Sequence, residues 1–295
     1  MALDNFIPTI WSAKIFQELQ NKHVYAALCN RDYEGEIKDF GDTVKINSIG
    51  DIEVDDYTKN STVIEPQELT DASMLLKIDQ AKYFAFKVDD VDKAQQNPKV
   101  MGEAMRKAAY ALRNEVDEFI VTFHTDVGQT LGTPAAPLKI NAGGAGTSDC
   151  TVIDAVSQIG AMLDKKNVPL EGRWMAIDPA FHQKLVLAKV IASTDNKEVF
   201  NNGFVGRALG FNFHLTNNFA KVGAGSNTPK LLAGTNRAIS FAEQVMKVEA
   251  YRPESSFADA VKGLHVFGAK VIDPNALVAL IYTAVNEKEI TEVED

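Results

Sequence analysis

The chain has 295 residues, of which 45% are hydrophobic and 24% are charged. This composition is typical of a globular protein with one large domain or two modest ones. The 40 Asp and Glu outnumber the 30 Lys and Arg, giving a formal net charge of −10 that disfavours tight direct binding of DNA or RNA, because such affinity comes largely from cationic contacts with phosphates.

The first 30 residues contain a weak amphipathic helical pattern. Ile10, Ile15 and Leu19 lie at helical spacing, and Trp11 and Phe16 add apolar weight that is loosely placed. Two interpretations remain open. The segment is either an arm laid across a partner or a terminal helix packed on its own core, and composition alone favours the second.

The next segment has the sequence pattern of a long two-stranded ribbon. Residues 41–57 alternate apolar and polar side chains, and residues 74–88 could supply the returning strand. Between them lies a polar tip with Pro66 and many turn formers, which has little to bury. Because an isolated two-stranded ribbon is only marginally stable in water, either the rest of the chain or another chain must cover it.

One very long helix is predicted from about Pro98 to about Thr125. Asn97 is a plausible N-cap, and Pro98 suits the first helical position. The helix would be roughly 40 Å long, about twice an average globular helix. Its apolar stripe consists of Met101, Ala104, Met105, Ala108, Leu112, Val116, Phe119, Ile120 and Phe123.

The Gly- and Pro-rich stretch 126–149 predicts a connection and a domain boundary. A helix follows, with Ser148 or Asp149 as its N-cap, and a mixed α/β region comes after it. This region is expected to contain a buried strand at 174–177, a helix that begins at Pro179, strands at 211–218 and 229–234, a segment at 238–253 that is ambiguous between strand and helix, and two apolar strands joined at Asp273-Pro274-Asn275.

No active site is predicted. The five histidines form no metal-binding pair, and nucleophile elbows, phosphate loops and dinucleotide fingerprints are missing. Asp89, Asp90 and Asp92 lack the glycine and distal glutamate of an EF-hand, so they indicate the entry to a helix. Cys29 and Cys150 are expected to be plain small side chains in a reducing compartment. We therefore expect no catalytic residue, no cofactor, no metal and no membrane partner.

Five phrases in order resemble the major capsid (coat) proteins of tailed bacteriophages, which have the Hong Kong 97-type fold. They are NFIPTIWSAKI, NRDYEGEIKDFGDTVKI, DQAKYFAFKVDDVDKAQ, AMRKAAYALRNEVDEFI and SSFADAVKGLHVFGAKVIDPNAL, and together they extend over nearly the whole chain. The resemblance implies an α+β capsid fold. Its parts would be an N-terminal arm at 1–30, an extended β-ribbon loop and its flanks at 31–95, a spine helix and connection of the peripheral domain at 96–150, a mixed α/β axial domain at 151–255, return strands of the peripheral domain at 256–286, and an acidic tail at 287–295.

The same resemblance implies what the chain would bind. It would assemble with itself into hexamers and pentamers of an icosahedral virion shell, built in the bacterial host cytoplasm. The shell would carry a portal protein and would enclose double-stranded DNA without sequence-specific binding. Because no fused scaffolding segment precedes the arm, either a separate scaffolding protein or a processed precursor is expected.

The ribbon would lie over the neighbouring subunit, which would supply the core that its tip lacks. We therefore expect inter-subunit contacts from the arm and the ribbon, at Trp11, Phe16, Asp55, Asp56, Tyr57 and Lys59. Lys59 is placed where some members form an isopeptide cross-link, although an exposed loop lysine is the simpler interpretation. Two alternatives stay open: an encapsulin-like nanocompartment shell with the same fold, and a soluble α/β enzyme that uses residues 151–255.

Overall fold

The computed structural model describes residues 24–33, 41–49, 59, 71–89, 100–142, 150–188, 204–222, 228–252 and 258–285. The helices are α2 (Tyr25–Leu28), α4 (Val100–Val121), α5 (Val152–Asp164) and α6 (Pro179–Leu187), with short 3₁₀ helices at Thr122–Thr125 and Pro274–Ala276. The strands are β1 (Thr43–Ile49), β2 (Asp71–Lys77), β3 (Gln80–Asp89), β4 (Gln129–Leu131), β5 (Leu138–Asn141), β6 (Cys150–Thr151), β7 (Arg173–Ile177), β8 (Phe204–Ala208), β9 (Phe211–Leu215), β10 (Ala220–Lys221), β11 (Pro229–Thr235), β12 (Ile239–Tyr251), β13 (Ala258–Val271) and β14 (Leu277–Ala284).

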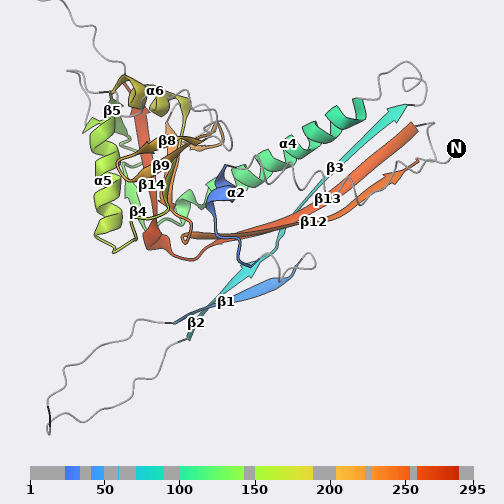
Figure 1. The fold of residues 1–295 in the computed structure, drawn as a ribbon, viewed down its shortest axis with the longest axis horizontal. Coiled ribbons are helices and arrows are strands. Elements are labelled where there is room, and N and C mark those ends of the chain that lie inside the picture. The colour runs from blue at the N-terminus through green and yellow to red at the C-terminus, as the bar shows by residue number, and fades with distance from the viewer. Residues whose placement is uncertain are drawn as a thin grey trace, which may run out of the picture.

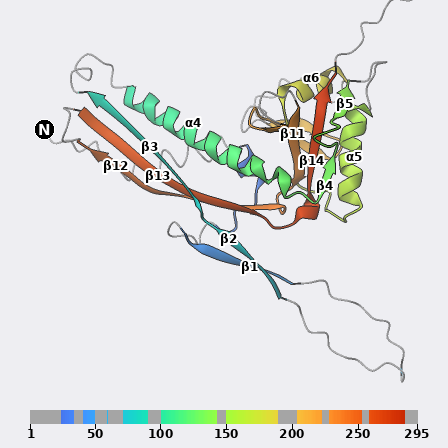
Figure 2. The same ribbon diagram turned by 180° about the vertical axis from the view of Figure 1, so that it is seen from behind.

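The described parts form two lobes and a projecting ribbon. A globular lobe contains α5, α6 and a nine-stranded sheet, and an extended lobe consists of α4 beside the long strands β3, β12 and β13 (Figure 1). Strands β1 and β2 pair with each other and project from the extended lobe, as the view from behind also shows (Figure 2). Within the described ranges, no helix is long and apolar enough to cross a membrane.

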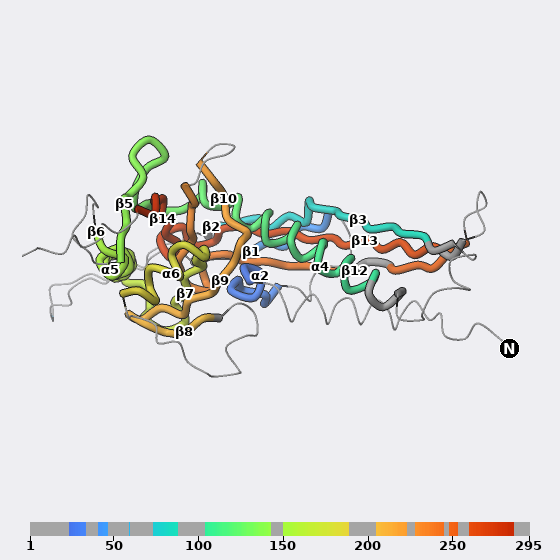
Figure 3. Tube along the Cα trace, turned by 90° about the horizontal axis from the view of Figure 1, so that it is seen from above, coloured from blue at the N-terminus to red at the C-terminus, as the bar shows by residue number. Residues whose placement is uncertain are grey.

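Helix α4 confirms the predicted long helix. Its 22 residues span about 33 Å at 1.5 Å per residue, and a 3₁₀ turn continues it to Thr125. Seen from above, it runs along the strands of the extended lobe (Figure 3). The predicted cap, Asn97 with Pro98, lies outside the described residues. The apolar stripe is the reason for this packing, since its buried members include Leu112, Val116 and Ile120.

The extended lobe has one sheet, with the order β12-β13-β3 and antiparallel pairing throughout. One face of this sheet packs on α4, where Val248, Val261 and the rings of Phe84 and Phe86 meet Leu112. The segment left ambiguous at 238–253 is therefore a strand. Because it lies at the edge of a sheet that α4 covers on one face, its apolar residues need not follow a single period.

The prediction of one returning strand at 74–88 is wrong in one respect, because the structure has two strands in this segment. β2 pairs with β1, whereas β3 leaves the ribbon and pairs with β13. The alternation of Leu76 and Ile78 continues into β3, so the pattern contains no break where the partner changes. Within the segment 31–95, expected to hold the ribbon and its flanks, β3 belongs to the three-stranded sheet.

The globular lobe is built on a mixed sheet in the order β6-β5-β14-β11-β7-β9-β8, with β10 on β11 and β4 on β14. The last strand, β14, lies in its middle, parallel to β5 and antiparallel to β11. Each of its residues from Leu277 to Tyr282 is buried, which explains the unbroken apolar run in the sequence. The sheet packs with α5 and α6 in one large core.

This topology corrects two strand placements. The expected boundaries put 238–253 with the axial region and both closing strands in the peripheral sheet. Instead, β12 pairs in the three-stranded sheet, whereas β13 and β14 separate at Asp273 into different sheets. A turn signal such as Asp-Pro-Asn marks a change of direction but does not say whether the next strand stays in the same sheet.

Both helices of the globular lobe have clear N-caps. Thr151 and Asp154 form a capping box on α5, so the expected cap at Ser148 or Asp149 is replaced by a residue closer to the helix. The hydrogen bonds from Thr151 hold the pKa of Asp154 below its ordinary value.

Asp178 caps α6 and also accepts a 2.5 Å hydrogen bond from the Tyr282 hydroxyl. Burial, followed by the Asp178 charge, raises the pKa of Tyr282 far above its ordinary value, so that hydroxyl stays protonated and donating.

Candidate assembly surfaces

The base of the ribbon has a core of its own. We call the ribbon root the buried cluster that joins β1 and the β2–β3 link to the three-stranded sheet, consisting of Val44, Ile46, Leu76, Ile78, Ala242 and Val266. The predicted alternation at Val44 and Ile46 is confirmed here, since both are buried whereas Lys45 is exposed. The root therefore packs within the subunit, on the sheet face that α4 does not cover.

The other face of the ribbon is exposed. Leu75 stands opposite Lys45 in the register, and 58% of its surface is accessible. Lys59 lies in a turn and is exposed, so it stays available for a contact with another chain. The remaining predicted contact residues, Trp11, Phe16, Asp55, Asp56 and Tyr57, lie outside the described residues.

A second exposed apolar surface lies farther out on the same face of the three-stranded sheet. Tyr83 is 78% exposed, and Leu264, directly opposite it in the register, is 38% exposed. Tyr251 lies farther along the sheet on β12, opposite Ala260, with the Lys262 ammonium 5.3 Å from its ring centre. Lys262 also pairs with Glu249 at 3.1 Å. We call Tyr83, Leu264 and Tyr251 the outer sheet patch.

The outer sheet patch was not among the surfaces predicted from the sequence. A signal for it does exist in AKYFAFK, where apolar side chains occupy both parities of β3. Phe84 and Phe86 face α4, which leaves Tyr83 and Ala85 on the uncovered side. A strand with apolar residues on both faces needs a cover on both faces, and the described part of this chain supplies only one.

The globular lobe exposes isolated apolar side chains at loops and at α6, namely Leu170, Leu187 and Leu209. Leu209 is the unusual one, because it sits in the tight turn between β8 and β9 with φ of 51°. A left-handed backbone disfavours a branched apolar side chain and is found where the surroundings require it. The exposed position of Leu209 in this turn therefore comes with a cost in backbone conformational energy.

A buried charged group ties the chain before the ribbon to the long strands. The Arg31 guanidinium pairs with the Glu243 carboxylate, and His265 Nε2 lies 3.2 Å from the other carboxylate oxygen. Neither the Glu243 nor the His265 side chain is exposed. His265 is thus a structural histidine held by a carboxylate, as its strand pattern predicts, and the group forms part of the scaffold.

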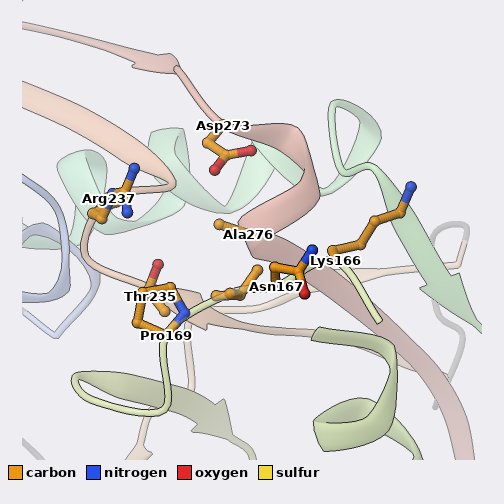
Figure 4. Close-up of a pocket in the computed structure, with 8 residues that line it drawn as sticks. Lys166, Asn167, Pro169, Thr235, Arg237, Asp273 and Ala276 are labelled. Atoms are coloured by element: carbon orange, nitrogen blue, oxygen red, sulfur yellow. The ribbon is translucent and has the colours of Figure 1, made fainter. Parts of the chain in front are cut away.

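The described residues include a polar pocket but no cluster of metal-ligating side chains. They contain no group of three or more His, Cys, Asp or Glu that could hold a metal ion. One polar pocket of about 220 Å³ lies between the α5–β7 loop, the β11–β12 turn and the turn before β14. In Figure 4, Lys166 extends away from Arg237 and Asp273, and no histidine or cysteine is among the residues that line this pocket. Asp273 already accepts a hydrogen bond from the Asn275 amide at 3.1 Å, which is a structural role in the turn.

Comparison with known proteins shows the family of this chain. The model of a family described as phage capsid protein matches residues 71–280. A solved structure from Mycobacterium phage Che8 is similar over 95% of this chain and 98% of that chain, with 28% identity and a TM-score of 0.65. A capsid structure of the cyanophage P-SCSP1u is similar over 91% and 90%, with 19% identity and a TM-score of 0.62. A virus-like particle from Pyrococcus furiosus shares the fold at 12% identity, over 92% and 98%, with a TM-score of 0.56. No curated protein matches the sequence.

Proposed function

Since this chain belongs to the phage capsid protein family, it is a structural major capsid protein of a phage, and we propose that its ribbon and outer sheet patch are the surfaces through which copies join into an icosahedral shell. The protein is a component of the virion and assembles with itself. The finer features proposed here are those of the Hong Kong 97-type fold. The extended lobe would be the peripheral domain with α4 as its spine, and the globular lobe would be the axial domain around the five- and six-fold axes.

The observation that carries the proposal is the unequal burial of the ribbon. Its root is packed against Ala242 and Val266 of its own subunit, whereas Leu75 on the opposite face is mostly exposed. A two-stranded ribbon gains stability only when an apolar face is covered. A neighbouring copy that covers the second face would supply the missing contact, and a closed shell repeats such modest contacts many times.

The remaining partners are proposals that the family supports. A separate scaffolding protein would guide assembly, a portal would occupy one vertex, and the lumen would hold double-stranded DNA. The net charge of −10 fits a shell that binds the enclosed DNA only weakly, because affinity for phosphates requires cationic contacts. An encapsulin-like compartment would share the fold but enclose proteins, so the nature of the material inside purified shells separates the two.

The experiment that tests the proposal replaces residues 50–70 with a two-residue Asn-Gly turn. Ile49 pairs with Asp71, so the shortened ribbon retains both strands and its root. We expect a folded subunit with an unchanged thermal unfolding midpoint that forms no shells, measured by sedimentation velocity and negative-stain microscopy beside the full-length chain. Normal shells from the shortened chain would refute the role of the ribbon. A full-length chain that remained a monomer with every scaffolding candidate would refute the shell function as assigned to this chain.

A further inference from the structure

A buried carboxylate on α4 holds the segment that leads out of the N-terminal region. Asp117 is 1% exposed, and its two oxygens accept hydrogen bonds from three consecutive backbone amides. The donors are the amides of Val24 at 3.3 Å, Tyr25 at 3.2 Å and Ala26 at 3.5 Å. These amides begin α2, so the contact occurs where the chain emerges from residues 1–23.

The held segment is short and is anchored at both ends. Tyr25 and Ala26 are fully buried in the main core. Four residues later, the Asn30 amide donates to the Ile239 carbonyl, and the Asn30 carbonyl accepts from the Phe241 amide, both at 2.8 Å. Residues 24–30 are thus clamped between α4 and β12, with Asp117 as the polar contact on the helix side. We call residues 24–30 the arm root.

The charge of this carboxylate is poorly solvated. Burial raises the pKa of Asp117 from 3.8 to about 6, although the three amides and the Arg113 guanidinium act in the opposite direction. Among the described residues, the Tyr25 hydroxyl and the Cys29 thiol of the arm root also face it, and burial and the Asp117 charge raise the pKa values of both. Asp178, which caps α6, acts on Tyr25, and Arg31 acts on Cys29. Since the hydroxyl and the thiol remain neutral, Asp117 is the group on this interface that changes charge near neutral pH.

We propose that Asp117 is the positioning residue that sets where the N-terminal arm leaves the subunit, and that the arm root is held more tightly when this carboxylate is protonated than when it is ionised. The sign follows from proton linkage. If the arm root detaches, water reaches Asp117 and its ordinary proton affinity returns. The attached state therefore binds the proton more tightly, so attachment is favoured at low pH and weakens as the pH rises through about 6.

The consequence for assembly depends on the proposed shell function, whereas the anchor itself does not. Val24 would be fixed on α4 when the root is attached and would leave the helix when the root is detached. If contacts between copies need the detached root, they would form more readily at neutral pH, where burial penalises the ionised carboxylate. Assembly and anchoring can therefore be measured separately, the first on shells and the second on subunits.

The test is amide hydrogen exchange of the full-length subunit at concentrations below assembly, followed by mass spectrometry between pH 5.0 and 7.5. After correction for the intrinsic exchange rate, protection of residues 24–29 should fall about 10-fold over this range, as expected for an acid whose pKa changes from 3.8 to about 6. Residues 152–164 of α5, a separate helix of the globular lobe, provide the internal reference.

Two variants isolate the responsible group. Asp117→Asn cannot titrate and should make the protection of residues 24–29 independent of pH. Glu118→Gln, an exposed neighbour on the same helix, should behave like the unmodified chain. A pH-independent profile in the unmodified chain overturns the proposal, and so does a profile that persists in Asp117→Asn. If Asp117→Asn does not fold, the profiles of the unmodified chain and Glu118→Gln still decide, because identical falls confined to residues 24–29 support the anchor and uniform changes reject it.

Discussion

Tyr83 on β3 and Leu264 on β13 stand directly opposite each other on the sheet face that α4 leaves uncovered. Cross-strand neighbours of this kind share one surface, since their side chains leave the sheet in the same direction. Phe84, the next residue along β3, points to the other face and packs on the apolar stripe of α4. Two adjacent aromatic residues therefore have opposite roles, one within the subunit and one available to another chain.

Alanine at each position should separate these roles. Tyr83→Ala removes an exposed ring, so the free energy of unfolding should change by less than about 0.5 kcal/mol. The critical concentration for shell assembly should nevertheless rise about 10-fold, because each subunit loses an apolar contact worth roughly 1.4 kcal/mol. Phe84→Ala is the matched control and should destabilise the subunit by about 2 kcal/mol. Urea unfolding and light scattering during assembly measure the two effects.

If Tyr83→Ala assembled like the unmodified chain, this result would contradict the placement of Tyr83 in a contact between subunits. In that case the outer sheet patch would stay uncovered in the shell. A large loss of stability in Tyr83→Ala would also count against it, because that loss would place the ring within the subunit core.

The ribbon crosses the three-stranded sheet at Gly268. A Cβ at this position would lie 2.3 Å from the Lys77 carbonyl oxygen and 3.0 Å from the Ile78 Cα, both backbone atoms that cannot turn aside. Gly268→Ala should therefore separate the ribbon root from the sheet and destabilise it by about 2 kcal/mol or more. Hydrogen exchange at β1 and β2 should increase well before exchange in α5.

Gly160→Ala provides a control of opposite sign. A Cβ at Gly160 would meet only the Phe211 ring at 3.7 Å, an ordinary contact, and the residue lies inside α5. Alanine there should stabilise the subunit by roughly 0.5–1 kcal/mol, because glycine is a poor helix former. If both variants changed the unfolding midpoint in the same direction, the close approach at Gly268 would not explain the first effect.

Two residues with left-handed backbones give a further matched pair. Leu209 has φ of 51° and Asn167 has φ of 55°, but only asparagine tolerates this conformation well. Leu209→Asn should raise the free energy of unfolding by about 1 kcal/mol, and Asn167→Ala should lower it by about the same amount. Chemical denaturation of the subunit measures both. Destabilisation by Leu209→Asn would show that Leu209 makes a contact worth more than the backbone strain.

Long periodic elements were the most predictable part of the fold. The stripe of α4 gave that helix to within a few residues, because burial of one face leaves a regular signal. The division at Ile78 and Asp79 was not predictable, because alternation shows which side chains of a strand are buried and not which strand it pairs with. In both β2 and β3 the less exposed of the described side chains are the even-numbered ones. The cap at Thr151 was missed because Ser148 and Asp149 are equally good cap residues and precede it.

The candidate surfaces were predictable only in part. The need of the ribbon for another chain followed from a strand pair with little to bury at its tip. Asp117 could not be identified, because an acidic residue beside Val116 in an amphipathic helix is ordinarily assigned to the solvent side. Its burial is produced by a segment about 90 residues away in the sequence, and no local pattern contains that contact.

The buried pair of Arg31 and Glu243 yields a last prediction, about how the ribbon is joined to the body. Glu243→Gln removes a charge that Arg31 and His265 both face, and so removes the ion pair of the mostly buried Arg31. We expect a loss of about 3 kcal/mol in the free energy of unfolding. Arg31→Gln alone should cost a similar amount, because the Glu243 carboxylate then stays buried without the Arg31 charge beside it. The double variant should lose less free energy of unfolding than the sum of the two single losses, with a coupling energy of roughly 1–3 kcal/mol from a double-mutant cycle in urea.

Additive losses would mean that the two residues stabilise the fold through separate contacts. In that case the chain before the ribbon would be held by the backbone bridge between Asn30 and β12, and the buried charges would be incidental to it.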